Sequence, residues 1–525
     1  MAEFELLPIE IMNIVLKDLD SPEDLASTIR SSPCALAALQ DDRCNILAQV
    51  IINNLSLYML KEVICIRYCP TFEFSDNYDS WNVYSPFWVL SYGSWAQKVA
   101  DFEDEYSNIH PYHYNVVGCF PYDLPSVLTV YRMRAAVNSL IADYVAHVNA
   151  MSTPDGPGPT FHPPDKSNLA SLTRQESDRL LAAFFRYEIM CRFTGRPYLQ
   201  QFASQDAESM LRHWETSFEY HKAWAMEEIC HVHDYVCSRY HMAFREIDHD
   251  ITTWIEHNKE IIAQSSHLPP HLRPITSVAR QLVEDGGPRY LFSRALYEHG
   301  QPQGTAGRLD MYVYIMNLAR LGLGVLRHFL TLDRLGRRQF ILETFEVLPS
   351  QSPYDELWEP VEAIEPSANF LQDERRRRLQ KRAIQTAGYD KWRSARFSGG
   401  SIAWDAQLGR LGRDGIPILL DPHAVDSQAL RKLGWAFWEL ERLKQLGIVT
   451  EQSTESNIVF RTDLQVQPIE FGRDPLPPDL SVLDQELVVE LWEKDFKPQF
   501  GTMPCPPKEF EERYQQIEPI LQYTI

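Results

Sequence analysis

Three helix starts follow one another near the beginning of the chain, and each is marked by a proline. The dipeptides are Leu7-Pro8, Ser21-Pro22 and Ser32-Pro33. Proline suits the first position of a helix because its missing N–H would have no intrahelical partner there and its φ is already helical. Ser21 is placed to cap the second helix, and the Asp24 side chain is placed to accept a hydrogen bond from the backbone N–H of Ser21 in return. The pattern predicts a compact bundle of three short helices.

The first of these helices, expected at about 8–19, carries more apolar surface than such a bundle can cover. On a helical wheel of 100° per residue, its apolar side chains fill an arc of about 160°. A helix that covers one core needs a stripe of about 100° or slightly more. The excess must therefore face either the rest of the chain or another protein. The arc holds Ile9, Ile11, Met12, Val15, Leu16 and Leu19, and Leu7 and Ile14 lie outside even that arc.

The order of these residues resembles an F-box. The resemblance covers about 6–32 and rests on Leu7-Pro8-x-Glu10-Ile11, Ile14-Val15-Leu16, Leu19 and Ser21-Pro22-Glu23-Asp24-Leu25. The third element departs from the family, which often has a Val-Cys-Arg-x-Trp-like end where this chain has Ser31-Ser32-Pro33-Cys34. The competing interpretation is that Leu-Pro-x-Glu-Ile merely begins an ordinary amphipathic helix.

In that family the motif docks on the Skp-type adaptor of cullin-based (SCF) ubiquitin ligases. The resemblance therefore implies an adaptor, through it a cullin, and an unknown protein substrate as partners. It also implies a set of adaptor-binding residues, namely Leu7, Pro8, Ile11, Ile14, Val15, Leu16 and Leu25.

A second segment, LRKLGWAFWELERLKQLGI at 430–448, resembles a region near the C-terminus of many filamentous-fungal F-box-like proteins. Its apolar stripe is formed by Leu430, Leu433, Phe437 and Leu440, and two tryptophans, Trp435 and Trp438, are displaced from it. Such tryptophans either anchor a partner or cover a second layer of core, and we favour the core.

The charge of the chain excludes some classes of partner. Lys and Arg number 50 against 72 Asp and Glu, which gives a net charge of −22. This charge repels phosphate backbones and anionic membranes, so neither nucleic acid nor a membrane is expected as a partner. Nine scattered cysteines and the lack of a secretory leader indicate free thiols in a cytoplasmic or nuclear protein. The longest uncharged run, 44–60, is interrupted by polar residues and is predicted to be a core helix.

A chain of 525 residues is too long to fold around a single hydrophobic core, so we expect several packed units. The expected fold class is all-α with a few short strands. The expected units are the F-box-like module at 1–45, helical regions at 46–150 and 169–348, and a mainly helical region at 349–525. A Pro/Gly-rich linker or loop is expected at 151–168. Apolar residues repeat at spacings of three and four at 309–332 and 429–446, which predicts helices there. Thr173-x-x-Glu176 is a capping box before a further helix. The few short strands are expected at segments such as 416–420 and 458–460. Because no repeat is present, the solenoids and propellers that usually recognise F-box substrates are not expected.

One row of cysteine and histidine side chains could supply metal ligands, but it is predicted to bind no metal. Cys230, His233, Cys237 and His241 share one face of a helix. Their eleven residues span about 16 Å, whereas zinc ligands must all lie within about 2.0–2.3 Å of one ion. Buried thiols and histidines at the edge of the core are expected instead. Phosphate-loop, dinucleotide, zinc-protease and serine-hydrolase motifs are also missing, so no active site and no cofactor are predicted.

The one basic cluster, at 375–378, has three interpretations. The favoured one is a solvated helix, because four consecutive arginines point to four sides and some pair with acidic residues four positions away. The others are a nuclear-import patch and a clamp for an acidic or phosphorylated substrate. The cluster consists of Arg375, Arg376, Arg377 and Arg378. Together these features predict a substrate receptor of a ubiquitin ligase, with a scaffold that joins no ligase, or an enzyme with a hidden site, as the alternatives.

Overall fold

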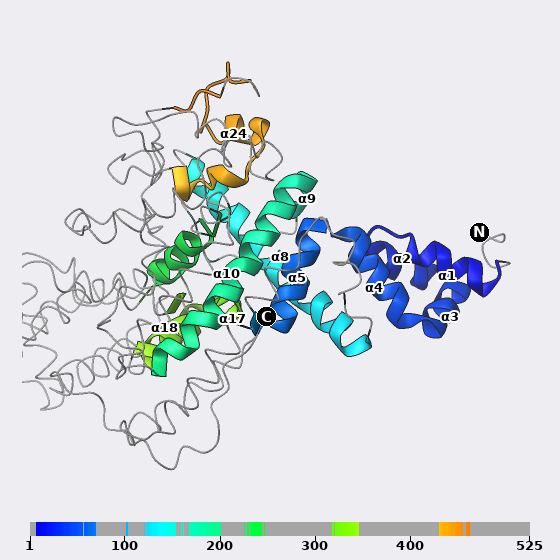
Figure 1. Cartoon of the computed structure of the whole chain (residues 1–525). Helices are drawn as coiled ribbons and strands as arrows, with labels where there is room; N and C mark the ends of the chain where they lie inside the picture. The colour runs from blue at the N-terminus through cyan, green and yellow to red at the C-terminus, as the bar shows by residue number, and fades with distance from the viewer. Residues whose placement is uncertain are drawn as a thin grey trace, which may run out of the picture.

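The computed structural model describes two hydrophobic cores joined by one helix. The described residues are 7–55, 57–69, 101–102, 120, 123–153, 159, 161, 167–200, 225, 228–229, 231–243, 246, 315, 318–319, 321–345, 430–454 and 458–461. Figure 1 shows the first four helices at one end, where they project from the other labelled helices. We call these four helices the module and the remaining described helices the body.

The module consists of α1 (Ile9–Lys17), α2 (Pro22–Ser31), α3 (Pro33–Asp41) and α4 (Arg43–Asn54). Two of the predicted starts are confirmed: Pro22 and Pro33 open their helices, and the hydroxyls of Ser21 and Ser32 accept hydrogen bonds from backbone N–H groups at 3.0 and 3.3 Å. The third differs by one position, because α1 begins at Ile9 and Pro8 is the residue before it. The Asp24 carboxylate does not bind the backbone N–H of Ser21, as a capping box would require. It accepts a hydrogen bond from the Ser21 hydroxyl at 2.6 Å instead.

Helix α4 was not part of the predicted three-helix bundle, and it belongs to both cores. Ile46 and Val50 are buried with α1, α2 and α3, whereas Ala48 and Ile51 are buried in the core of the body. The residues of one helix therefore hold the module against the body. The module boundary expected after residue 45 falls inside this helix.

The prediction of a single core helix at 44–60 is wrong, because two helices, α4 and α5, occupy this stretch. Chain direction changes after α4, where Leu55 is extended, and α5 (Leu57–Tyr68) follows. Among the helices that the structure describes, none is long and apolar enough to cross a membrane.

The body is built around two long helices, α8 (Leu124–Ser152) and α10 (Arg174–Gln200). Helix α10 is buried on every side from residue 179 to 191, which is the burial of a central helix. Helix α5 packs on α10, and the helical residues 231–243 contact both long helices. Helices α9 (Ser167–Ala170) and α17 (Leu323–Thr331) pack on α8, and α18 (Arg334–Phe345) packs on α17 (Figure 1). The capping box is confirmed: the backbone N–H of Thr173 donates to the Glu176 carboxylate at 3.0 Å, and that of Glu176 donates to the Thr173 hydroxyl at 3.2 Å.

The predicted linker at 151–168 overlaps α8, which runs to Ser152, and α9, which begins at Ser167, and its residues Met151 and Phe161 lie against the core of the body. Phe161 packs on the core and lies 6.2 Å from the ring of Phe329. The guanidinium of Arg337 lies 3.9 Å from the centre of the Phe161 ring, a cation–π contact.

Two of the predicted helices, at 309–332 and 429–446, are each interrupted by a glycine whose backbone has a positive φ. At 309–332 the break is Gly322, with φ 94°, and α17 starts after it. At 429–446 the break is Gly434, with φ 66°, followed by the short 3₁₀ helix η6 (Trp435–Phe437) and by α24 (Leu440–Gln445). Periodicity missed both breaks because a glycine between apolar residues does not disturb the spacing of its neighbours.

The predicted all-α class is confirmed. Strand-like pairing in the described part of the chain is limited to isolated bridge residues, among them the antiparallel pair Val449 and Phe460. The strand expected at 458–460 is thus reduced to one bridge residue, and the one expected at 416–420 lies outside the described residues.

Candidate functional site

The candidate site is the outward face of α1. Met12 and Leu16 are fully buried in the module core, whereas Ile14 is 63% exposed, Ile11 43% and Ile9 39%. Ile14 is two residues from both Met12 and Leu16, and two residues correspond to about 200° around a helix. Ile14 therefore points almost directly away from the core, with Ile11 beside it.

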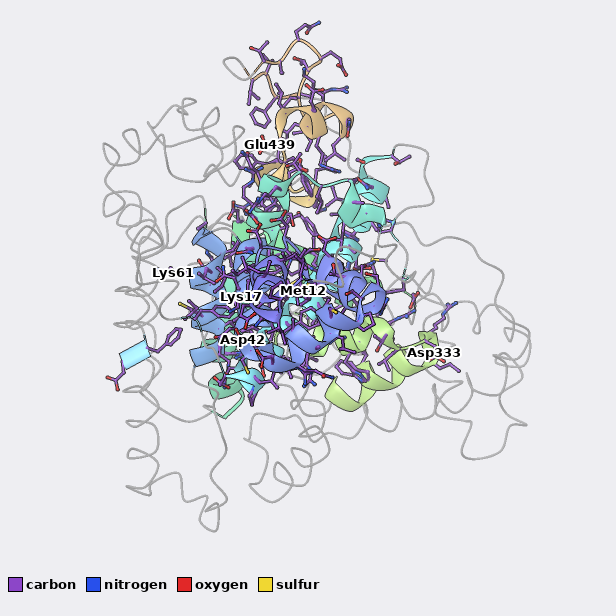
Figure 2. The ribbon with its side chains drawn as sticks, turned by 90° about the vertical axis from the view of Figure 1, so that its right-hand side faces the viewer. Met12, Lys17, Asp42, Lys61, Asp333 and Glu439 are labelled. Atoms are coloured by element: carbon purple, nitrogen blue, oxygen red, sulfur yellow. The ribbon has the colours of Figure 1, made fainter. Side chains whose placement is uncertain are left out.

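Two polar contacts hold α1 in this orientation. The Lys17 ammonium donates to the Asp42 carboxylate at 2.6 Å, and this hydrogen bond lowers the pKa of Asp42. The side-chain amide of Asn53 on α4 donates to the backbone carbonyls of Lys17 and Leu19 at 2.7 and 3.2 Å, which satisfies the C-terminal end of α1. Figure 2 shows the module from its outer end, with Met12, Lys17 and Asp42 close together.

The residues implied by the F-box resemblance divide into two groups. Pro8, Ile11 and Ile14 are exposed, and Leu7 and Val15 are half-buried. Leu16 and Leu25 are buried in the core of the module itself. Leu7 also packs on this core. The structure therefore assigns Leu7, Leu16 and Leu25 to the fold of the module and leaves the other four at least partly accessible from outside.

Three further residues belong to this surface or to its edges and were absent from the predicted set. Ile9 is exposed at the start of α1. Glu10 and Asp18 are exposed and lie four residues before and after Ile14, about 40° from it on the wheel. The helical wheel had grouped Ile9 with the apolar arc, but only the packing of α1 shows which part of the arc is exposed.

The C-terminal segment 430–448 is part of the core. Trp435 and Trp438 are both fully buried, so the favoured interpretation of these side chains is confirmed. Trp438 stacks on Tyr144 of α8 with ring centres 6.1 Å apart, and its indole N–H donates to the carbonyl of Leu433 at 2.6 Å. These tryptophans are not available as anchors for a partner.

The buried middle of α10 carries charges that the sequence did not reveal. Arg186 donates to Glu62 at 2.8 Å and to Glu228 at 3.3 Å, and all three side chains are buried. Burial raises the pKa of Glu228 to about 8, against the attraction of Arg186. It also lowers the pKa of Arg186 to about 10, so the guanidinium keeps its charge at neutral pH. At neutral pH, Glu228 therefore holds a proton beside the charged guanidinium of Arg186.

The other candidate residues lie in the body or outside the described part. His233 is buried and pairs with Cys237 at 3.5 Å, as expected for neighbours on one helix, and His241 is half-buried. Cys230 is not among the described residues, and within them no group of three or more potential metal ligands is found. The basic cluster at 375–378 lies outside the described residues.

Comparison of the chain with protein-family models, with characterised proteins and with solved structures gives no significant match.

Proposed function

We propose that this chain is an F-box-type substrate receptor of a cullin-based ubiquitin ligase. In this proposal the module docks on a Skp-type adaptor, and the body presents a protein substrate. The chain then needs no active site, since it acts by raising the concentration of substrate near the ligase. Such a protein works in the cytoplasm or the nucleus.

The observation that carries the proposal is the outward apolar face of α1. Helix-in-groove recognition uses apolar anchors at helical spacing, and Ile11 and Ile14 provide two of them three residues apart. Ile9, exposed two residues before Ile11, adds a third apolar side chain at the start of α1. Exposed apolar side chains grouped in this way are typical of a protein–protein contact.

The rival is a scaffold that uses the excess apolar surface of α1 against its own body. That use requires the excess side chains to be buried within the chain. Ile9, Ile11 and Ile14 account for half of the large apolar side chains found exposed in the described part of the chain. Their exposure supports docking on a second protein.

Co-purification with a recombinant fungal Skp-type adaptor tests the proposal. We expect Ile11→Ser with Ile14→Ser to abolish binding, because both anchors are lost. The matched control is Tyr131→Ser with Leu335→Ser, which removes two other exposed apolar side chains, from α8 and α18. Binding that survives the α1 change, or that is absent in the natural chain, would contradict the proposal.

A further inference from the structure

The apolar face of α1 is flanked by two carboxylates that nothing in the module neutralises. Glu10 and Asp18 are exposed one turn before and one turn after Ile14. Within the described part of the chain, neither carboxylate takes part in a hydrogen bond or an ion pair. The most exposed apolar side chain of the module therefore lies between two negative charges.

Among the described basic residues of the module, Lys17, Arg30 and Arg43, none forms an ion pair with Glu10 or Asp18. Lys17 is the basic residue of α1, and it is bound to Asp42 at 2.6 Å. The other exposed charges nearby are mainly acidic, and Asn13 ties the carboxylate of one of them, Asp41, to α1 at 3.5 Å. The net charge of −22 adds to the negative potential.

This arrangement restricts the partner. When Ile14 enters a groove, the side chains one turn away approach the rim of that groove and lose part of their water. An acidic rim would repel them, and an apolar rim would leave two ionised groups poorly solvated. A basic rim attracts them and speeds the encounter.

We propose that the adaptor surface that receives α1 is an apolar groove whose rim presents lysine or arginine side chains to Glu10 and Asp18. This inference rests on the proposed function and adds the chemistry of the partner. Ile11 and Ile14 fill the groove, and the two carboxylates set the orientation of α1 within it.

The test measures the affinity of the full-length chain for the recombinant adaptor as a function of salt. Glu10→Lys with Asp18→Lys should weaken binding about tenfold at about 0.05 M salt and less than about twofold at about 0.5 M, because salt screens rim charges. The helix itself is little affected: a lysine is unfavourable in the first turn of α1 and favourable at its end.

Two controls accompany this variant. Glu441→Lys with Glu451→Lys makes the same change in net charge at two exposed positions, in α24 and just after the C-terminal segment, and it should leave the affinity within about twofold. Glu10→Gln with Asp18→Asn removes the charges without reversing them and should give a smaller loss. It also provides the test if the lysine variant fails to fold.

The outcomes separate the inference from the proposed function. If the serine variants at Ile11 and Ile14 abolish binding while charge reversal leaves it unchanged or stronger, the proposed function stands and the basic rim is wrong. A loss of equal size in the Glu441 and Glu451 control also overturns the basic rim, since the effect would then be one of net charge. If the natural chain does not bind the adaptor, both proposals fail.

Discussion

Glu176 accepts hydrogen bonds from Arg442, 266 residues further along the chain, at 3.2 Å to each carboxylate oxygen. The same carboxylate closes the capping box with the N–H of Thr173 and accepts the N–H of Glu439 at 3.0 Å. A local device at the start of α10 is thus also the attachment point of the C-terminal segment. Arg179, one turn later, strengthens this attachment by donating to the carbonyl of Phe437 at 2.8 and 3.0 Å.

The first prediction is that Glu176→Ala destabilises the body by about 2–4 kcal/mol. The change leaves two backbone N–H groups and the Arg442 guanidinium without their acceptor in a buried place. Denaturant unfolding followed by tryptophan fluorescence measures it. Glu441→Ala is the control, because the Glu441 side chain is 80% exposed and its loss should cost less than about 0.5 kcal/mol. Equal effects of the two changes would refute the role of Glu176.

The second prediction concerns Gly434 and Tyr144. A Cβ added at Gly434 would lie 2.2 Å from the Tyr144 hydroxyl, and φ is 66°. Gly447 has the same φ, but its nearest neighbour would be 3.6 Å away. Gly447→Ala should therefore cost about 1 kcal/mol from backbone strain alone, whereas Gly434→Ala should cost at least about 2 kcal/mol more.

A double variant isolates the overlap at Gly434. The Tyr144 hydroxyl is buried and makes no hydrogen bond in the structure, so Tyr144→Phe should be close to neutral. Adding Tyr144→Phe to Gly434→Ala should restore part of the lost stability, because the nearest atom is removed. Thermal melts of the four variants give the answer, and strictly additive effects would show that the two residues are not coupled.

The third prediction is a stability that decreases with rising pH because of Glu228. Its pKa is about 8 in the folded chain and 4.5 ordinarily, since burial opposes ionisation. Between these values the folded state binds one more proton than the unfolded state, so the free energy of unfolding falls as pH rises from about 4.5 to 8 and then levels off.

The variant Glu228→Gln should remove this dependence. Relative to the natural chain, it should gain about 1–3 kcal/mol between pH 6 and pH 8. Urea unfolding at both pH values measures the difference, and other titrating groups cancel in the comparison. An identical pH dependence in the two proteins would mean that Glu228 is ionised throughout.

Local chemistry predicted part of this fold. The caps at Ser21 and Thr173 depend on residues three positions apart, so they are visible in the sequence. The cap of α17 is not: Gly322 has no side chain, and Glu188 of α10 accepts the N–H of Leu323 at 2.7 Å from 135 residues away. Partners this distant are brought together by packing, which no local pattern records.

The candidate site shows the same limit. The width of the apolar arc predicted an excess of apolar surface on the first helix, and the exposure of Ile11 and Ile14 agrees with it. A helical wheel does not show which side of the helix faces the core. It therefore grouped Leu16, which is buried in the module, with residues such as Ile11 that point outward. The buried charges on α10 were also hidden, because Arg186 meets Glu62 from another helix.

The last prediction separates the folding role of α1 from its binding role. Leu16→Ala should destabilise the module by about 2–4 kcal/mol, because a fully buried leucine leaves a cavity, whereas Ile14→Ala should change its stability by less than about 0.5 kcal/mol. Adaptor binding should show the reverse order. Ile14→Ala should weaken it, and Leu16→Ala should retain it at temperatures where the module is still folded. Hydrogen exchange on α1 reports the first property and titration calorimetry the second. If Leu16→Ala lost binding while exchange showed an intact module, the apolar contact would involve the opposite face of α1, and the orientation described here would be wrong.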